Sequence, residues 1–460
     1  MAARDYGSCS SGSGAEPNVE PVALPELSCP SMQELCDKPR CRAGSGRAAL
    51  RAAVLLAAVL LGPSPGLGAE PGAVSLDVWH TFGANSQDER IFLDAVEAFE
   101  AAHPEIDVEP VRIPYLQNLQ QFINSSQGGE APDVVRLSDT EIGRIGHISV
   151  EGLPLLEDLR PHLTPVQRAR FEPRALNALR YGASLYAIPV SQGTLALVYN
   201  KALFDAAGVQ YPRDDWTTDD LIAAASALTG GDVIGIALPL RWSYWFIPFL
   251  TGFGATLFDA EDNPTLDSPG SARALEWFLD LERVHGVSAS STSIEAMSTQ
   301  FQLSRAAMVL DGSWNWNTYE AARLDLGLAV MPIVAETGIR MGPMFNVFGW
   351  GVSKQSASKV AAAGLALWLS SYNVQKAFAL RTYMIPTDRA LAADPHIAAD
   401  TTLHGYLRQT EFGTEVPTTR ATNMVFEQLD TALELTFTGQ LDARSALAAA
   451  NEEMERILRQ

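Results

Sequence analysis

The stretch LYAIPVSQGTLALVYNKALFDAAGV, residues 185–209, decides the fold class of this 460-residue chain. Two extended apolar runs lie on either side of a polar break at residues 191–193, and the second run leads into a helical pattern. Gly208 stands where that helix should end, because glycine readily adopts the left-handed conformation of a C-terminal cap. Strands that pass into helices through short connections are typical of an α/β fold.

The segment upstream has the same order. Residues 73–80, AVSLDVWH, alternate apolar and polar side chains as a strand does, and residues 89–104 place apolar side chains at helical spacing. Further strands are predicted at residues 106–113 and 131–138, with a helical stretch between them. This alternation extends the α/β prediction over the N-terminal part of the folded region.

Downstream, residues 216–229 predict a helix that Thr217 or Thr218 caps, with acidic residues in its first turn. Residues 306–316, AAMVLDGSWNW, begin as a buried strand and end in two tryptophans separated by one asparagine. Two more strands are predicted at residues 326–334 and 346–354, and a closing helix at residues 442–458. The C-terminal part is otherwise helical, and the sequence contains no internal repeat.

The N-terminal region predicts export. Residues 1–46 are rich in Ser, Gly and Pro, contain all four cysteines and lack a periodic apolar pattern, which indicates disorder. Residues 47–69 combine two arginines, the apolar run AAVLLAAVLL and the small residues GPSPGLGA, in the order of a cleavable signal peptide. This apolar run falls short of the ~20 residues that cross a bilayer. Because a signal peptide normally opens a chain, either the start is placed too far upstream or the leader is unusual.

Charge and cysteine content agree with export. The formal net charge of −21 belongs to the residues after 69, since residues 1–69 contain six basic and six acidic side chains. An acidic surface disfavours nucleic acid and anionic membranes as partners. No cysteine follows position 41, so neither a disulfide framework nor a lipid-modified cysteine is expected after cleavage. We therefore expect a soluble, monomeric protein of the periplasm.

Seven segments form an ordered series: VWH, FEAAHPEIDVE, APDVV, LYAIPVSQGTLALVYNKALFDAAG, AAMVLDGSWNW, FGWGVSKQSASKVAAAGLALWLSS and MIPTDRAL. In order and spacing they resemble the extracellular sugar-binding proteins that serve ABC importers, the family of the maltose-binding protein. The resemblance spans nearly all of residues 74–460. It implies an α/β, two-lobed periplasmic-binding-protein fold, with the ligand in the interlobe cleft and several hinge crossovers between the lobes.

The resemblance also implies where the chain passes between the lobes. The crossovers would lie near residues 191–194 and 332–341. Lobe one would comprise residues 74–191 and 341–385, and lobe two residues 195–337 and 386–460. Open α/β sheets bind ligands at the carboxyl ends of their strands, and these ends meet at the cleft when two lobes face each other.

Trp314 stands where the family's sugar-stacking tryptophan follows a strand end. An indole can lie against the apolar C–H face of a pyranose, while neighbouring acids and amides, such as Asp311, bind its hydroxyl groups. Trp316 is a second candidate from the same loop. The alternative for both indoles is packing at a lobe interface.

Further candidate ligand contacts each have core packing or turn formation as their alternative. The cluster RWSYW supplies Trp242, Tyr244 and Trp245, and the strand turn FGWG supplies Trp350. The polar candidates are Asp139 after the third strand, Gln192 at the first crossover, and His80 with Thr81 after the first strand. Arg420 and Asn423 fall near a family position that often holds a tryptophan, which this chain lacks there.

The sequence shows no motif for metal or nucleophilic chemistry. Its seven histidines form no HExxH or other close pair, and no GxxxxGK[ST] or GxSxG motif is present, so no metal, cofactor or catalytic residue is predicted. The resemblance implies that the protein binds a saccharide, such as a malto-oligosaccharide or another di- or oligosaccharide, for the permease subunits of an ABC importer. Two alternatives stay open: an exported carbohydrate-active enzyme with a similar aromatic cleft, and the same fold binding a polyamine, a phosphorylated glycerol or iron.

Overall fold

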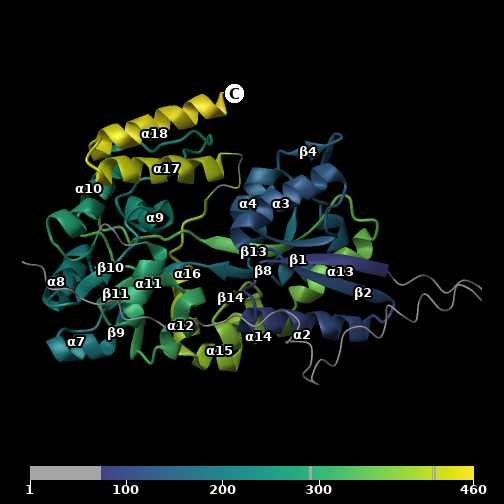
Figure 1. The fold of residues 1–460 in the computed structure, drawn as a ribbon, viewed down its shortest axis with the longest axis horizontal. Coiled ribbons are helices and arrows are strands. Elements are labelled where there is room, and N and C mark those ends of the chain that lie inside the picture. The colour runs from purple at the N-terminus through teal and green to yellow at the C-terminus, as the bar shows by residue number, and fades with distance from the viewer. Residues whose placement is uncertain (1–73, 290–292, 417, 419–420, 460) are drawn as a thin grey trace, which may run out of the picture. The chain divides into compact units, whose positions relative to one another are not determined.

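The structure, a computed structural model, describes residues 74–289, 293–416, 418 and 421–459. The predicted N-terminal extension and the predicted signal peptide, residues 1–46 and 47–69, lie outside the described residues. The described residues contain two larger sheets, each covered by helices, and these form the centres of two lobes (Figure 1).

The first lobe is built on a six-stranded sheet with the strand order β14-β8-β13-β3-β1-β2. β1 pairs in parallel with β2 and β3, whereas β13 runs antiparallel to β3 and β8, and β14 antiparallel to β8. The strands are β1 (Val74–His80), β2 (Ile106–Arg112), β3 (Val134–Ser138), β8 (Ala187–Gly193), β13 (Asn346–Val352) and β14 (Ile385–Pro386). β3 and β8 are buried along their whole length, as strands covered on both faces are.

Helices lie on both faces of this sheet: α2, α13 and α14 on one, and α3 and α4 on the other (Figure 1). Ser86 caps α2 because its hydroxyl accepts a hydrogen bond from the Glu89 amide. Ser138 and Glu141 form a capping box that begins α4 directly after β3. The helices are α2 (Gln87–Ala102), α3 (Tyr115–Gly128), α4 (Asp139–Ile145), α13 (Lys359–Leu369) and α14 (Tyr372–Thr382).

The second lobe is built on a four-stranded sheet with the order β10-β11-β9-β12. β9 runs antiparallel to β11 and β12, and β10 is parallel to β11. The strands are β9 (Leu195–Asn200), β10 (Ile234–Ala237), β11 (Ala306–Gly312) and β12 (Leu326–Ala329). Its helices are α7 (Lys201–Ala207), α8 (Thr218–Leu228), α9 (Ser243–Gly252), α10 (Pro269–Arg283), α11 (Ile294–Gln302), α12 (Trp316–Ala321), α16 (Thr401–Thr410), α17 (Thr422–Phe437) and α18 (Ala443–Leu458).

Shorter elements connect these parts. They are β4 (Ser149–Val150), β5 (Leu153–Pro154), η1 (Arg160–His162), α5 (Pro165–Ala169), α6 (Pro173–Ala178), β6 (Arg180–Tyr181), β7 (Ser184–Leu185), η2 (Ser313–Asn315), η3 (Arg389–Ala393) and α15 (Pro395–Ala399). Within the part of the chain that the structure describes, no helix is both long and apolar enough to cross a membrane.

The chain passes between the two sheets at several points. β8 ends at Gly193 and β9 begins at Leu195, so Thr194 alone separates the first sheet from the second. The second passage lies between β12 and β13, and the third follows β14, after which α16 packs on β9 and β12. Each sheet has its own apolar core, with residues such as Phe92 and Val135 in the first and Phe246 and Leu310 in the second.

The predicted strands and helices are confirmed, with small differences at their ends. Thr217, one of the two predicted caps, begins α8 in a capping box with Asp220. The strand predicted at residues 326–334 ends earlier, at Ala329. Pro332 has no amide hydrogen to donate to a ladder, and Ile333 forms only isolated bridges.

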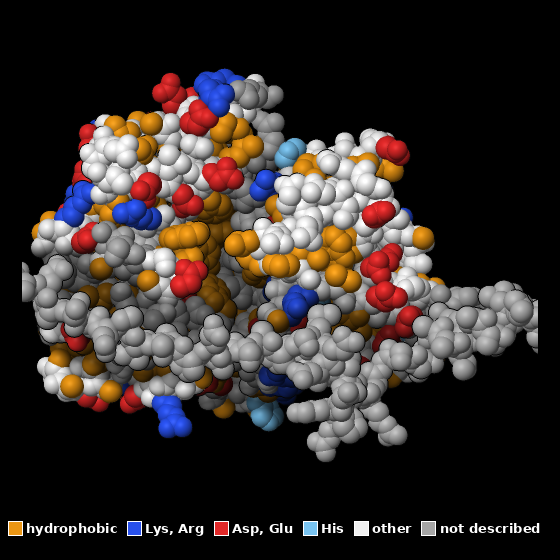
Figure 2. All heavy atoms as spheres, viewed as in Figure 1, with side chains coloured by type: hydrophobic (Ala, Val, Ile, Leu, Met, Phe, Trp, Pro, Cys, Tyr) orange, Lys and Arg blue, Asp and Glu red, His pale blue; other side chains and the backbone are white. Residues whose placement is uncertain are grey.

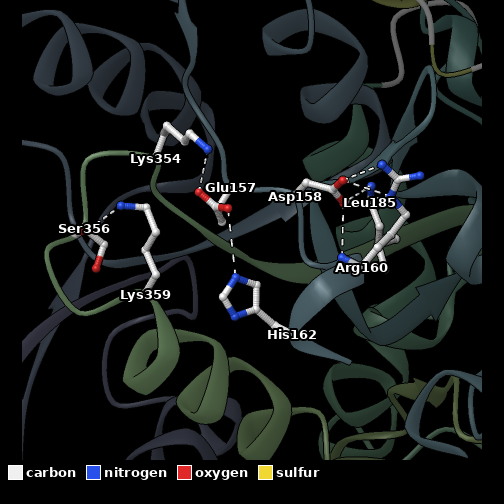
Figure 3. A network of polar contacts seen from close by, with 8 residues as sticks. All are labelled: Glu157, Asp158, Arg160, His162, Leu185, Lys354, Ser356 and Lys359. Carbon is white, nitrogen blue, oxygen red and sulfur yellow. Dashed lines mark hydrogen bonds and ion pairs between the residues drawn. The ribbon is translucent and has the colours of Figure 1, made fainter. Parts of the chain in front are cut away.

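A polar network on the first lobe connects the segment after β5 with the end of β13 (Figure 3). Glu157 accepts a hydrogen bond from Lys354 Nζ at 2.8 Å. Asp158 accepts from Arg160 Nη2 at 2.6 Å and from the Leu185 amide at 3.2 Å. These contacts hold a surface segment in place.

Candidate ligand-binding site

A cavity of about 240 Å³ lies between the two lobes. Figure 2 shows the surface hollowed between them, with hydrophobic side chains gathered in the hollow. The first lobe, the first passage between the sheets and the turn after β11 all contribute to its wall. The lining residues are Thr81, Phe82, Gly83, Asp88, Tyr115, Arg136, Ser191, Gln192, Gly193, Ser313, Trp314, Phe348, Thr382 and Met384.

Trp314 presents a half-exposed indole, 48% accessible, to this cavity. It follows β11 in the short turn η2, and its ring occupies the space beside the backbone of Gly312. A Cβ atom at position 312 would lie 2.1–2.3 Å from three ring carbons, and one at Gly193 would lie 3.4 Å from the ring. The indole can therefore lie where it does only because position 312 lacks a side chain, whereas a Cβ atom at position 193 would just touch the ring.

Asp311 holds the turn that carries Trp314. Its buried carboxylate accepts from the Gly312 amide at 2.8 Å, from Asn315 Nδ2 at 2.9 Å and from the Tyr319 hydroxyl. Burial raises the pKa of Asp311 to about 6, and these three hydrogen bonds oppose that rise. The expectation that Asp311 contacts the ligand is corrected, because the carboxylate is fully buried and supports the turn from behind.

Arg136 and Asp88 provide a hydrogen-bond donor and a hydrogen-bond acceptor in the wall of this cavity. The Arg136 Nη1 group donates to Thr81 Oγ1 at 2.7 Å, and its guanidinium carbon lies 4.7 Å from the Phe82 ring centroid and 4.2 Å from that of Phe348. Asp88 projects from the first turn of α2. The cavity thus combines aromatic surface with two charged side chains, as sites for polyhydroxylated ligands commonly do.

The family model described as Bacterial extracellular solute-binding protein matches residues 83–376, which include both Arg136 and Trp314. The chain belongs to this family. The family membership that the sequence segments predicted is thereby confirmed.

Two relatives of this solute-binding protein are similar over most of their length. The galactooligosaccharide-binding protein of Bacillus subtilis (strain 168) is 24% identical over 416 residues, which cover 88% of this chain and 94% of that protein. The maltotriose-binding protein of Pyrococcus abyssi (strain GE5 / Orsay) is 24% identical over 347 residues, 74% of this chain and 72% of that protein.

Solved structures have the same fold. The GacH receptor of Streptomyces glaucescens GLA.O matches with a TM-score of 0.76 at 25% identity, over 84% of this chain and 99% of that one. The maltose/maltodextrin-binding domain of Bdellovibrio bacteriovorus, solved with maltotriose, matches with a TM-score of 0.75 at 22% identity, over 84% and 100%. The predicted two-lobed α/β solute-binding fold is confirmed.

Two of the predicted tryptophans of this solute-binding protein lie in the second core instead of the cleft. Trp316 is 4% exposed, begins α12, donates from Nε1 to Glu320 and packs against the ring of Tyr406. Trp245 is buried and donates from Nε1 to the Leu310 carbonyl at 2.7 Å. Both expectations are corrected, because α9 and α12 direct these two indoles into the core of the second lobe.

The remaining members of the RWSYW cluster differ in exposure. Tyr244 is half-buried, with its ring centroid 6.3 Å from that of Trp314, so it lies beside the indole without lining the cavity. Trp242 is exposed at the start of α9 and is also absent from the cavity wall. The structure therefore places Tyr244 next to a wall residue, and neither Tyr244 nor Trp242 forms the wall.

Trp350 and His80 belong to the first core. Trp350 is 1% exposed and stacks on Phe92 with ring centroids 5.4 Å apart. His80 is 2% exposed and lies 4.6 Å from Phe92, and burial lowers the pKa of His80 to about 4. The expectation that these two side chains face the ligand is corrected, because both are buried between the first sheet and α2, against Phe92.

Two of the other polar candidates lie at the cavity. Thr81 and Gln192 line it; Gln192 donates from Nε2 to the Pro386 carbonyl at 2.9 Å, and its buried Oε1 has no partner. Asp139 is buried at the start of α4 and accepts from Asn346 Nδ2 at 2.5 Å. It lines a separate cavity of about 200 Å³, and burial raises its pKa to about 7.

Arg420 lies outside the described residues, and Asn423 stands in α17 with a side chain that the structure does not describe.

Sequence reasoning missed several wall residues, including Phe82, Asp88, Tyr115, Arg136 and Phe348. One signal could have found Arg136, since a charged side chain within the apolar run of a buried strand is uncommon. Asp88 carried no such signal, because an acid in the first turn of a helix is ordinary.

Proposed function

We propose that this protein binds a saccharide in the cleft between its lobes and delivers it to the permease of an ABC importer. The observation that carries the proposal is the position of Trp314. Its half-exposed indole lies beside Gly312 and Gly193 in the cavity wall. An aromatic surface of this kind suits the C–H face of a pyranose, and polar side chains around it suit the hydroxyl groups.

The names of similar proteins support the class of ligand. One relative is named for galacto-oligosaccharides and another for maltotriose, and one similar structure holds maltotriose. We infer that the ligand is a di- or oligosaccharide of the malto- or galacto- type.

We infer further that the protein binds its saccharide without cleaving it. Most glycosidases use a pair of carboxyl groups that flank the scissile bond. Among the residues that line the cavity, Asp88 is the single acid. Overnight incubation with maltotriose should return the sugar intact by mass spectrometry, and the appearance of maltose and glucose would contradict this inference.

We also propose that the protein is exported to the periplasm and cleaved near Ala69. The support is the basic, apolar and small-residue order of residues 47–69, together with membership of an extracellular family. N-terminal sequencing of the native protein should find Ala69 or Glu70 first. Recovery of a chain that still contains Leu55 in the membrane fraction would contradict the proposal.

A thermal-shift screen tests the central proposal. A ligand at 100 times its dissociation constant stabilises the folded state by roughly 2.7 kcal/mol, which raises the melting temperature measurably. The panel should contain maltose, maltotriose, galacto-oligosaccharides, spermidine and glycerol 3-phosphate. A shift with one or more sugars supports saccharide binding, whereas a shift confined to spermidine or glycerol 3-phosphate would overturn it.

A further inference from the structure

Arg136 is a buried cation in the cavity wall without an ion pair. It is 7% exposed and forms no ion pair with the described residues, although the negative charges of Asp88 and Glu141 act on it from farther away. Of its five N–H donors, one at Nη1 bonds to Thr81, while Nε is buried without a partner. Burying a charged group without full hydrogen bonding is costly, so we look for a ligand that would supply the missing partners.

The surroundings hold the Arg136 side chain in place. The rings of Phe82 and Phe348 lie against its guanidinium, and Thr81 fixes one amino group. These contacts already restrict the rotamers of the long side chain. Less conformational entropy is therefore lost when a ligand binds. The remaining donors are therefore presented in a fixed orientation.

Asp88 supplies the matching acceptor. It lines the same cavity, and its Oδ1 atom is buried without a hydrogen-bond partner. Burial raises the pKa of Asp88, whereas a hydrogen bond from Thr382 and the charge of Arg136 oppose the rise. Each side chain thus keeps one polar atom without a hydrogen-bond partner, Nε of Arg136 and Oδ1 of Asp88.

The two charges together select among ligands. A carboxylate would pair with Arg136 but would bring negative charge toward Asp88, and a cation would do the reverse. A hydroxyl group both donates and accepts, so adjacent hydroxyls on one ring can satisfy both side chains without adding charge. We propose that Arg136 and Asp88 select a neutral saccharide by binding neighbouring hydroxyl groups of one sugar ring; this rests on the proposed function.

Isothermal titration with maltotriose and with galactotriose tests the proposal. Arg136→Met and Asp88→Asn should each weaken the binding of whichever neutral sugar the wild-type protein takes by about 10- to 100-fold, because a hydrogen bond to a charged group is lost. Salt should change the wild-type affinity little, since a neutral ligand makes no ion pair. Thermal melts of each variant check that the fold is retained, and Arg136→Lys replaces Arg136→Met if the latter does not fold.

The surface pair Asp158 and Arg160 provides matched controls, because it has the same residue types and lies outside the cavity (Figure 3). Asp158→Asn and Arg160→Met should bind the sugar as the wild type does. Wild-type affinity in folded Arg136 and Asp88 variants would overturn this proposal and leave saccharide binding standing. Tighter wild-type binding of digalacturonate than of either neutral sugar would overturn it too. A wild-type protein that binds no sugar overturns the proposed function, and this inference with it.

Discussion

Gly312 and the buried acid Asp311 decide where the Trp314 indole lies. Gly312 leaves room for the ring, Gly193 lies at contact distance from it, and Asp311 fixes the turn through three hydrogen bonds. The sequence placed Trp314 correctly after a strand, but it did not show that Trp316 begins a helix or that Trp350 lies inside a strand, β13, paired on both sides. Their different fates depend on helix direction and sheet pairing, which a single sequence does not encode locally.

Replacing Trp314 by alanine should abolish most of the binding without unfolding the protein. Removing an aromatic anchor from a binding site typically costs roughly 2 kcal/mol or more, about 30-fold in affinity. The melting temperature of the sugar-free variant should change little, because the side chain is half-exposed. Calorimetric titration and thermal melts on one preparation measure both quantities. A large loss of stability with unchanged affinity would show that the indole serves as core packing.

His80 should make stability fall in acid. Burial lowers its folded-state pKa to about 4, below the ordinary value of 6.5, so the unfolded chain binds more protons between these pH values. Its contribution is fully present above pH 6.5 and is lost progressively toward pH 4, by up to about 3 kcal/mol. His80→Gln should flatten the decline in chemical-denaturation curves between pH 7 and 4. The exposed His396 provides a control, since His396→Gln should leave the slope as in the wild type.

At the scale of elements, periodicity and capping carried most of the prediction. The alternation in β1 and the capping residue Thr217 of α8 could be predicted, because each depends only on residues nearby in the sequence. Sheet order was not, because β13 lies between β3 and β8 through pairings that join residues far apart in the sequence. The residues of the cavity wall could not be predicted for the same reason. Phe348 on β13 and Arg136 on β3 become neighbours only through the pairing of these strands.

The junction of β11 and η2 gives a prediction at this scale. In Gly312→Ala the new Cβ would lie 2.1–2.3 Å from the Trp314 ring, so the indole must move away from the backbone of residue 312. Sugar affinity should fall by about tenfold or more, while stability changes little because the ring can move into the cavity. Gly364→Ala in α13 is the control, since nothing lies within 4 Å of its added carbon. Equal sugar affinities in the two variants would contradict the role given to Gly312.

At the scale of the whole protein, both lobes and the passage between them meet at one cavity. Arg136 and Phe348 belong to the first sheet, Trp314 follows a strand of the second, and Gly193 ends β8 one residue before the second sheet begins. A ligand held by all of these contacts gains its full binding energy only when the lobes are close together. Binding should therefore shift the population toward a closed arrangement.

We propose hinges at residues 191–194 and 332–341, about which the lobes rotate when a sugar bridges them. Small-angle scattering of the wild-type protein should give a smaller radius of gyration with saturating sugar than without it. Trp314→Ala, at the same sugar concentration, should contract less than the wild type, because its affinity is lower and the aromatic contact from the second lobe is missing. An unchanged wild-type radius at saturation, verified by titration on the same sample, would mean that the sugar enters a cleft of fixed width. Delivery to a permease would then have to depend on something other than closure.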